Sequence, residues 1–512
     1  MPTEPGLLSS WGLLGTLAWP LALAVAAFVA PRLGNLWGLA GAAGVIASVA
    51  AVVAGVLNNG VLTHEIGAWA PPLGIVLRVD GLSAIMLAVT AVVGGVASLY
   101  SVGYLRPLSP ALAPEPDAGA KEQRYFWPLW LFLWAALNAL FISGDAFNLY
   151  VTLELLGLSA TALVALNGEA RALNAAMRYL LISLLSSVSY LLGVGLLYGQ
   201  TGALDLQLIA ERLQPGVTSA AAAGLIITGL LLKSALFPLH FWLPAAHSNA
   251  PAPVSAVLSG LVVKATFYLV LRYWFQVFPD LATPTAGQFL GLLGAAAILW
   301  GSLQAMLAER LKLLVAYSTV AQLGYLFLVF ALASGDPAVD YTAWTAAVFY
   351  LLAHAGAKAA MFLAAGSIMR AAGHDRIAEL HGISHRLPVS MFAFGVAGIN
   401  LVGLPPSGGF IGKWLMLNAA FTGDGLVWAV VILLGGLLSA VYVMRVLAPA
   451  FVGTPGPGLG VGVRRTVPWI MEWSALALAV LALALGFVAA WPLDALRIGS
   501  PWAGARLMGT MP

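Results

Sequence analysis

The chain has 512 residues, of which 61% are apolar and 8% are charged, against the roughly 25% charged residues of an ordinary soluble domain. With a mean hydropathy of +0.94, this composition excludes a water-soluble enzyme and predicts a polytopic membrane protein. The sequence has no cysteine, which excludes disulfides, thiolate-held iron–sulfur clusters and cysteine-ligated zinc. The net charge of +3 includes no block of like charge that would indicate nucleic-acid binding.

Apolar runs of about 20 residues predict the membrane-spanning helices. We expect an all-α fold of about 14 transmembrane helices. The first run has no basic segment before it and no small-residue cleavage site after it, so we interpret it as a retained helix and not a signal peptide. In chain order, the runs lie at residues 7–30, 35–57, 80–103, 126–143, 147–166, 176–198, 219–237, 252–277, 287–306, 313–334, 341–366, 390–422, 427–449 and 473–491.

The basic residues between these runs fall mostly on one side of the predicted membrane. Loops after odd-numbered helices hold fourteen of the 23 lysines and arginines, and the opposite loops hold five. Because basic residues are retained on the cytoplasmic side, this asymmetry predicts a cell inner (plasma) membrane protein with both termini outside. The first group includes Arg310, Lys312 and Arg376, and the second includes Arg78, Arg272 and Arg497.

The remaining four basic residues are lysines inside apolar runs, although the sequence has only six lysines. A lysine at the bilayer centre costs about 2.5 to 3.5 kcal/mol on insertion scales, so it usually faces a wet or protein-lined interior. Arginines are absent from the interiors of the predicted helices, whereas one acid, Glu154, lies roughly 13 Å along its helix from Asp145. The predicted intramembrane set is Glu154, Lys233, Lys264, Lys358, Lys413, His240, His247 and His354.

Two proline-rich stretches should interrupt their helices and leave backbone carbonyls without partners. The first is KSALFPLHFWLPAAHSNAPAPVSAVLSG, which contains Pro238 and follows Lys233. The second is GLPPSGGFIGKW, in which Pro405 and Pro406 precede Lys413. Each interruption therefore accompanies an intramembrane lysine.

The layout of the breaks predicts two inverted five-helix repeats. The broken helix is fourth in each group of five, and an odd number of helices makes the second group enter the membrane from the opposite side. The predicted domains are residues 1–125 (helices 1–3), 126–277 (first repeat), 278–449 (second repeat) and 450–512 (helix 14 and tail).

Five motifs in this order resemble the antiporter-like proton-pumping subunits of respiratory complex I, the D subunit of the Mrp multisubunit cation/proton antiporters and related subunits of membrane-bound hydrogenases. The motifs are LELLGLSA, KSALFPLHFWLPAAHSNAPAPVSAVLSGLVVK, LKLLVAYSTVAQLGY, AHAGAKAAMF and GLPPSGGFIGKW, within residues 126–449. The chain stops before the long amphipathic helix of the most distal complex I subunit, which argues against that member.

The resemblance implies two half-channels for protons joined by a hydrated line of charged residues. It assigns Glu154 to the glutamate of the fifth helix and Lys233 to the lysine of the broken seventh. Lys264 matches the lysine or histidine of the eighth helix. The eleventh-helix site corresponds to His354 with Lys358, and the twelfth-helix terminal residue to Lys413, where one complex I subunit has glutamate.

The pairing of an acid with a buried lysine also has a physical reading. Apolar surroundings favour a neutral amine, whereas a nearby carboxylate favours a charged one. A movable Glu154–Lys233 pair could therefore switch the lysine between holding its proton and releasing it to water or to the next base, Lys264. His354 and Lys358 lie four residues apart on one helical face, which permits transfer through water.

Structural alternatives remain open for each site. Glu154 and Lys233 could form a static ion pair that fixes helix packing. Lys358 and Lys413 could extend to the headgroups, although Lys264 is too deep for that. His240 and His247 are expected to satisfy freed backbone groups rather than to bind a ligand. The group that includes Ser318 could line water or bond between helices.

These features favour a proton-translocating subunit of a larger membrane complex, with no catalytic site or cofactor of its own. It would work with sodium exchange or with a redox module, as in a proton-translocating oxidoreductase. We expect other hydrophobic subunits as partners, including a homologous antiporter-like chain. The alternative is a stand-alone secondary transporter, which a long series of charges disfavours relative to a single central cluster.

Overall fold

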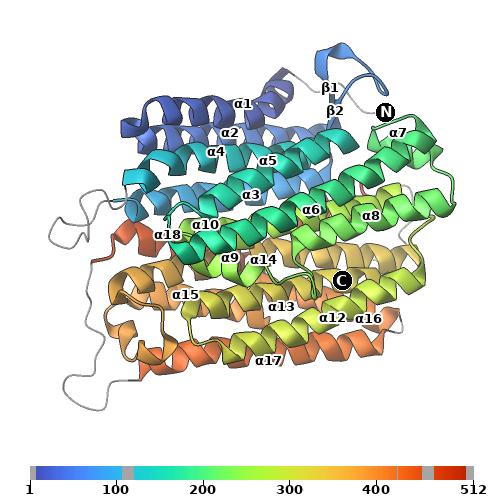
Figure 1. Cartoon of the computed structure of the whole chain (residues 1–512). Coiled ribbons are helices and arrows are strands. Elements are labelled where there is room, and N and C mark those ends of the chain that lie inside the picture. Colours follow the sequence, from blue (N-terminus) through green and yellow to red (C-terminus); the bar gives the residue numbers. More distant parts are fainter. Residues whose placement is uncertain (1–6, 107–119, 424, 453–465, 503–512) are drawn as a thin grey trace.

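The computed structural model describes residues 7–106, 120–423, 425–452 and 466–502 (Figure 1). Twelve described helices are long and apolar enough to cross a membrane, and two shorter apolar helices, Pro388–Val402 and Trp469–Ala484, bring the number to fourteen. The predicted all-α polytopic fold is confirmed. A hairpin of two short antiparallel strands, β1 (Leu62–Glu65) and β2 (Val76–Val79), is an addition that the hydropathy pattern did not indicate.

The first three spans are drawn in blue in Figure 1, where α1 and α2 form one edge of the molecule and α3 lies farther inside, against α14 and α18. They are α1 (Leu7–Val29), α2 (Gly34–Asn59) and α3 (Gly81–Tyr104). Helix α3 begins where the side chain of Asp80 accepts a hydrogen bond from the backbone N–H of Ser83, which satisfies one of the free N–H groups of the first turn.

The next five spans contain the first break. They comprise α4 (Ala120–Ile142), α5 (Ala146–Val164), α6 (Ala170–Thr201), the pair α8 (Val217–Ser234) and α9 (Leu243–Asn249), and the pair α10 (Ala252–Val257) and α11 (Val263–Arg272). The short helix α7 (Leu206–Arg212) lies between α6 and α8. Two π-helical turns, Leu258–Val262 and Tyr273–Val277, flank α11.

The following five spans contain the second break. They are α12 (Pro284–Leu307), α13 (Leu311–Leu332), α14 (Pro337–Ala372), the pair α15 (Pro388–Val402) and α16 (Gly408–Thr422), and α17 (Leu426–Phe451). Helices α1 and α17 lie at opposite edges of Figure 1. The last span, α18 (Trp469–Ala484), packs against α14 and α15 and is followed by the short α19 (Ala490–Ala495).

The two groups of five meet along α9, α13 and α14. Helix α9, after the first break, packs against α13, and α10 packs against α14. Helix α14 is buried over almost its whole length. The centre of the molecule is therefore built from the helices that carry most of the predicted intramembrane charges.

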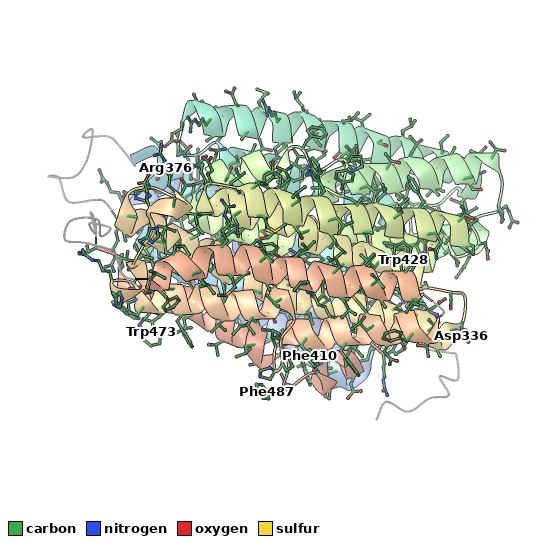
Figure 2. The ribbon with its side chains drawn as sticks, turned by 90° about the horizontal axis from the view of Figure 1, so that it is seen from below. Asp336, Arg376, Phe410, Trp428, Trp473 and Phe487 are labelled. Carbon is green, nitrogen blue, oxygen red and sulfur yellow. The ribbon has the colours of Figure 1, made fainter. Side chains whose placement is uncertain are left out.

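The loops fall into two groups at opposite ends of the helices. At one end, which we call the hairpin side, β2 lies beside Ser143, and Asp145 lies beside Asp205. At the other end, which we call the basic side, Arg310 lies beside Arg376. Figure 2 shows Arg376 and Asp336 at these two ends. The predicted alternation of loops is therefore present, whereas Arg464 and Arg465 lie outside the described residues.

Two basic residues assigned to loops are instead buried within helical spans. Arg272 ends α11 and is 7% exposed, so the prediction that arginine is absent from the helix interiors is wrong. Lys312 lies in the first turn of α13 and is 3% exposed. A hydropathy pattern predicts that a charged residue at the end of an apolar run is exposed to solvent. Neighbouring helices, however, cover both Arg272 and Lys312.

Candidate functional site

Glu154 on α5 and Lys233 on α8 lie side by side beneath the first break. Their closest atoms, Lys233 Nζ and Glu154 Oε1, are 3.8 Å apart. The ammonium group donates at 3.0 Å to the carbonyl of Leu153 and also to the hydroxyl of Ser187 on α6. The lysine is nearly enclosed, whereas the glutamate side chain is 21% exposed. The carboxylate is thus the freer member of a loose ion pair.

Lys264 on α11 is completely buried and lies just after the first π-helical turn. Its ammonium group donates to the carbonyl of Ser259, which belongs to that turn. The hydroxyl of Ser259 is 2.8 Å from that of Thr319 on α13. Because a π-helical turn shifts the usual backbone pairing, it leaves a carbonyl available for the lysine.

Lys358 on α14 is also completely buried. Its ammonium group donates to the carbonyl of Val315 and, at 2.7 Å, to the hydroxyl of Ser318, both on α13. These contacts exclude the alternative in which Lys358 extends to the headgroups. Ser318 therefore lies in the site as a direct partner of the lysine.

Lys413 on α16 occupies the second break. Its ammonium group donates at 2.8 and 3.1 Å to the carbonyls of Leu401 and Val402, at the end of α15. Pro405 and Pro406 prevent the helix from continuing through these carbonyls, so the lysine satisfies groups that the break leaves free. The same ammonium lies 4.4 Å from the ring centre of Tyr325, within cation–π distance.

Two histidines lie between the lysines. His354 on α14 is within electrostatic range of Lys264, Lys358 and Lys413. His247 on α9 is within range of Lys264 and Lys358. Both rings are fully buried, and none of their four nitrogens has a hydrogen-bond partner among the described residues. Since buried polar groups are normally paired, these rings are the natural places for internal water to bind.

The structure divides the predicted site into two parts. Lys264, His247, Lys358, His354 and Lys413 form a connected electrostatic series. The Glu154–Lys233 pair stands apart: among the described residues, no hydrogen bond or ion pair joins it to Lys264. The predicted handover from Lys233 to Lys264 therefore requires water or a conformational change.

The prediction that His240 and His247 satisfy freed backbone groups has a different outcome for each histidine. His240 contacts the backbone of Pro238 in the first break. For His247 the prediction is wrong, because other side chains take the free carbonyls nearby. The indole of Trp242 donates at 3.0 Å to the carbonyl of Leu232, and Lys312 donates to the carbonyl of Ala250.

A polar network around Gln322 on α13 extends the series beyond Lys413. The Gln322 amide donates at 3.0 Å to Ser439 and at 2.9 Å to Tyr442, both on α17. Its carbonyl accepts a hydrogen bond from the hydroxyl of Tyr350, whose ring stacks 5.9 Å from that of His354. The network joins α13, α14 and α17. In the motif LKLLVAYSTVAQLGY, Gln322 therefore forms hydrogen bonds between helices.

Replacing Gln322 with methionine is expected to lower stability by about 1 to 3 kcal/mol, since it leaves buried hydroxyls without their partner. The measurement is the midpoint of thermal unfolding in detergent. The control is Gln288→Met, which removes a single hydrogen bond from the exposed Gln288 to the carbonyl of Ala331. Equal midpoints for the two variants would show that the network contributes nothing beyond one surface bond.

Metal binding has no support in the described part of the chain, where no three histidine, aspartate or glutamate side chains gather closely enough to hold an ion. The chemistry available at this site is that of amines, imidazoles and one carboxylate. Such groups can exchange protons with each other and with water.

Comparison with known proteins identifies the family. A model described as "NADH:quinone oxidoreductase/Mrp antiporter, TM" matches residues 143–439, and one described as "NADH-Ubiquinone oxidoreductase (complex I), chain 5 N-terminus" matches residues 70–111. The first match covers more than half of the chain and includes both breaks and all six of the residues assigned to proton transfer.

Individual relatives and a solved structure agree. The chain is 37% identical over 427 residues to the N subunit of the NADH-quinone oxidoreductase of Desulforudis audaxviator, covering 82% of each chain. It is 30% identical over 402 residues to the D subunit of the Na(+)/H(+) antiporter of Alkalihalophilus pseudofirmus, covering 78% of each. A chain of the Mrp complex from Dietzia sp. superposes with a TM-score of 0.86 at 26% identity, covering 97% of this chain and 98% of that one. The chain therefore belongs to the family of antiporter-like transmembrane subunits that NADH:quinone oxidoreductases and Mrp antiporters share.

Proposed function

We propose that this chain moves protons through the membrane as a subunit of a larger complex. The observation that carries the proposal is the series of enclosed amines and imidazoles from Lys264 to Lys413, with the Glu154–Lys233 pair beside it. Burying so many ionisable groups in a membrane protein is costly, and such groups usually mark an ion pathway.

The pair at the first break acts as the switch. While the Glu154 carboxylate stays near Lys233, it stabilises the ammonium form. When the carboxylate moves away, the enclosed amine can release its proton. The 3.8 Å separation and the partial exposure of Glu154 suit a carboxylate that moves.

The second part carries the proton across the centre. Lys264 and Lys358 exchange through water at His247 and His354, and Lys413 exchanges with one aqueous side at the second break. Lysine suits this role because its neutral form is reachable in an enclosed site, whereas arginine stays charged. The two groups of five helices, residues 126–277 and 278–449, act as inverted repeats, each contributing one break and its lysine.

Monovalent cation exchange, as in an Mrp-type antiporter, or a redox module is the energetic partner of this proton movement. Relatives named as a component of an antiporter and as a component of a quinone oxidoreductase support both versions. The complex includes other membrane subunits, among them a homologous antiporter-like chain.

The test is to purify the intact complex through a tag on this chain, identify the co-purifying proteins and reconstitute it in vesicles with an internal pH dye. Proton movement that depends on a sodium gradient, or on an electron donor and quinone, supports the proposal. Transport by the purified single chain would instead establish a stand-alone transporter, and a complex that moves no protons would refute the proposal.

Orientation can be tested directly because the chain has no native cysteine. We propose that the basic side faces the cytoplasm of the plasma membrane. A cysteine at the exposed position of Arg376 should then resist an impermeant thiol reagent in intact cells, whereas one at Asp494 should react. The reverse labelling pattern would contradict the orientation.

A further inference from the structure

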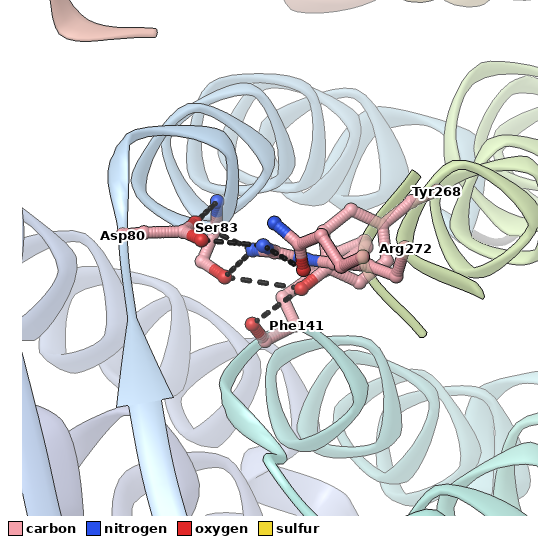
Figure 3. Close-up of polar contacts among 6 residues, drawn as sticks. Asp80, Ser83, Phe141, Tyr268 and Arg272 are labelled. Carbon is pink, nitrogen blue, oxygen red and sulfur yellow. Dashed lines mark hydrogen bonds and ion pairs between the residues drawn. The ribbon is translucent and has the colours of Figure 1, made fainter. Parts of the chain in front are cut away.

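A buried cluster at the hairpin side joins α3, α4 and α11 (Figure 3). Arg272 forms a two-pronged ion pair with Asp80, one guanidinium nitrogen to each carboxylate oxygen. The guanidinium also donates at 2.8 Å to the hydroxyl of Ser83 and lies 5.0 Å from the ring centre of Tyr268. Such a pair fixes the arginine in one orientation.

The hydrogen bonds of the cluster run in one direction. The Tyr268 hydroxyl donates at 3.1 Å to the carbonyl of Phe141, so it can only accept from Ser83, whose hydroxyl is 3.0 Å away. Ser83 in turn accepts from Arg272. The chain of donors therefore ends on a backbone carbonyl, which has no proton to pass on.

A cavity of about 350 Å³ lies directly against this cluster on the hairpin side. Its lining includes Tyr268, Arg272, Gln276, Arg78 and Asp205. The volume and the polar lining suit several water molecules. Water can therefore reach Arg272 and Tyr268 from this side of the protein.

The same helix leads from the cavity to the amine series. Lys264, Tyr268 and Arg272 follow one another at four-residue intervals on α11, so they share one face. Eight residues correspond to about 12 Å of helix, which is the depth of Lys264 below Arg272. The cluster is thus the layer between a hydrated cavity and the first lysine of the series.

Asp80 remains ionised in this position. Burial opposes its charge, but the guanidinium of Arg272 and the backbone N–H of Ser83 outweigh burial and hold the pKa of Asp80 below its ordinary value. The ion pair is therefore intact at neutral pH, and the guanidinium stays in place.

We propose that the Arg272–Asp80–Ser83–Tyr268 cluster is a proton seal that prevents the lysine series from exchanging protons with the hairpin side through α11. The fixed guanidinium repels protons and cations that enter the cavity, as fixed positive charges do in selective pores. The one-directional hydroxyl chain blocks proton hopping past it. This inference rests on the proposed proton pathway and adds a positioning role for residues outside it.

The test measures passive proton leak into vesicles that contain the intact complex, under an imposed pH difference without sodium gradient or electron donor. Arg272→Met, which removes the charge and keeps the length, should raise the leak roughly tenfold, as expected for a barrier about 1.4 kcal/mol lower. Asp80→Asn should raise it less, because the guanidinium remains and asparagine keeps the helix cap.

A double variant shows where the leak runs. Combining Arg272→Met with Lys264→Met should return the leak to the wild-type level, since the pathway beyond the seal is then interrupted. The matched control is Arg497→Met, which breaks an exposed ion pair on the same side of the protein, and its leak should equal that of the wild type.

The possible outcomes separate the two proposals. An assembled Arg272→Met complex without excess leak, or a leak that persists in the double variant, overturns the seal and leaves the proposed function standing. If Arg272→Met does not assemble, Asp80→Asn decides, and an assembled Asp80→Asn complex without excess leak overturns the seal. Normal driven transport by Lys264→Met alone refutes the proposed function instead.

Discussion

Alanine in place of Glu154 or Lys233 is expected to lower proton-coupled transport by roughly a hundredfold or more, the scale on which positioned acids and bases act. Removing Glu154 leaves the enclosed ammonium of Lys233 without its counter-charge, 3.8 Å away in the native chain. Removing Lys233 leaves the hydroxyl of Ser187 and the carbonyl of Leu153 without their donor. The measurement is driven proton flux in vesicles of the intact complex.

The control for this experiment is Glu379→Gln, which removes an exposed carboxylate that pairs with Arg376 on the surface. Its transport should equal that of the wild type. Assembly of each variant is checked by the yield of co-purifying subunits. Near-normal transport in both alanine variants would mean that the pair is only a structural link between α5 and α8.

Substitutions at Lys264 should separate a proton carrier from a structural charge. Lys264→Arg and Lys264→Met should both lower transport by roughly a hundredfold, the first because guanidinium stays protonated and the second because it has no titratable group. Lys264→His should keep a substantial part of the activity, since imidazole also binds and releases protons. The measurement is again driven proton flux.

The arginine variant is the informative one. Lys264 is completely buried and donates to the Ser259 carbonyl, a contact that a guanidinium can also make. Thermal unfolding of each purified variant tests whether the site accommodates the new side chain. Full activity in a stable Lys264→Arg complex would rule out Lys264 as a proton carrier.

The positions of the breaks and of the enclosed lysines could be predicted from the sequence, because each depends on local chemistry. Proline removes a backbone donor and clashes with the preceding turn, so the proline-rich stretches after Lys233 and before Lys413 break their helices where expected. A lysine in the middle of an apolar run has no short route to water, which is why Lys264 is buried as expected; Lys358, for which extension to the headgroups was the alternative, is buried too.

Residues at the ends of apolar runs could not be placed in the same way. Arg272 and Lys312 looked like loop residues, yet an ion pair with Asp80 and a carbonyl of the first break hold them inside the protein. Their partners are 192 and 62 residues away in the chain, so no local pattern reveals them. The π-helical turn whose Ser259 carbonyl accepts a hydrogen bond from Lys264 likewise depends on tertiary packing.

The order of the sites also depended on tertiary structure. The sequence places Lys264 as the next base after Lys233 but does not show whether the two amines touch, and the described residues contain no direct bond between them. His247 was expected to serve the break and instead lies among Lys264, Lys358 and Lys312. The packing of α9 against α13 and of α13 against α14 helps to bring these groups together.

Proton movement through this chain depends most on water reaching the enclosed amines, and a cryo-electron microscopy map of the intact complex that resolves ordered water tests this directly. We expect water molecules at the rings of His247 and His354 and between Lys264, Lys358 and Lys413. A map in which apolar side chains fill these spaces and leave the amines mutually isolated would contradict the account.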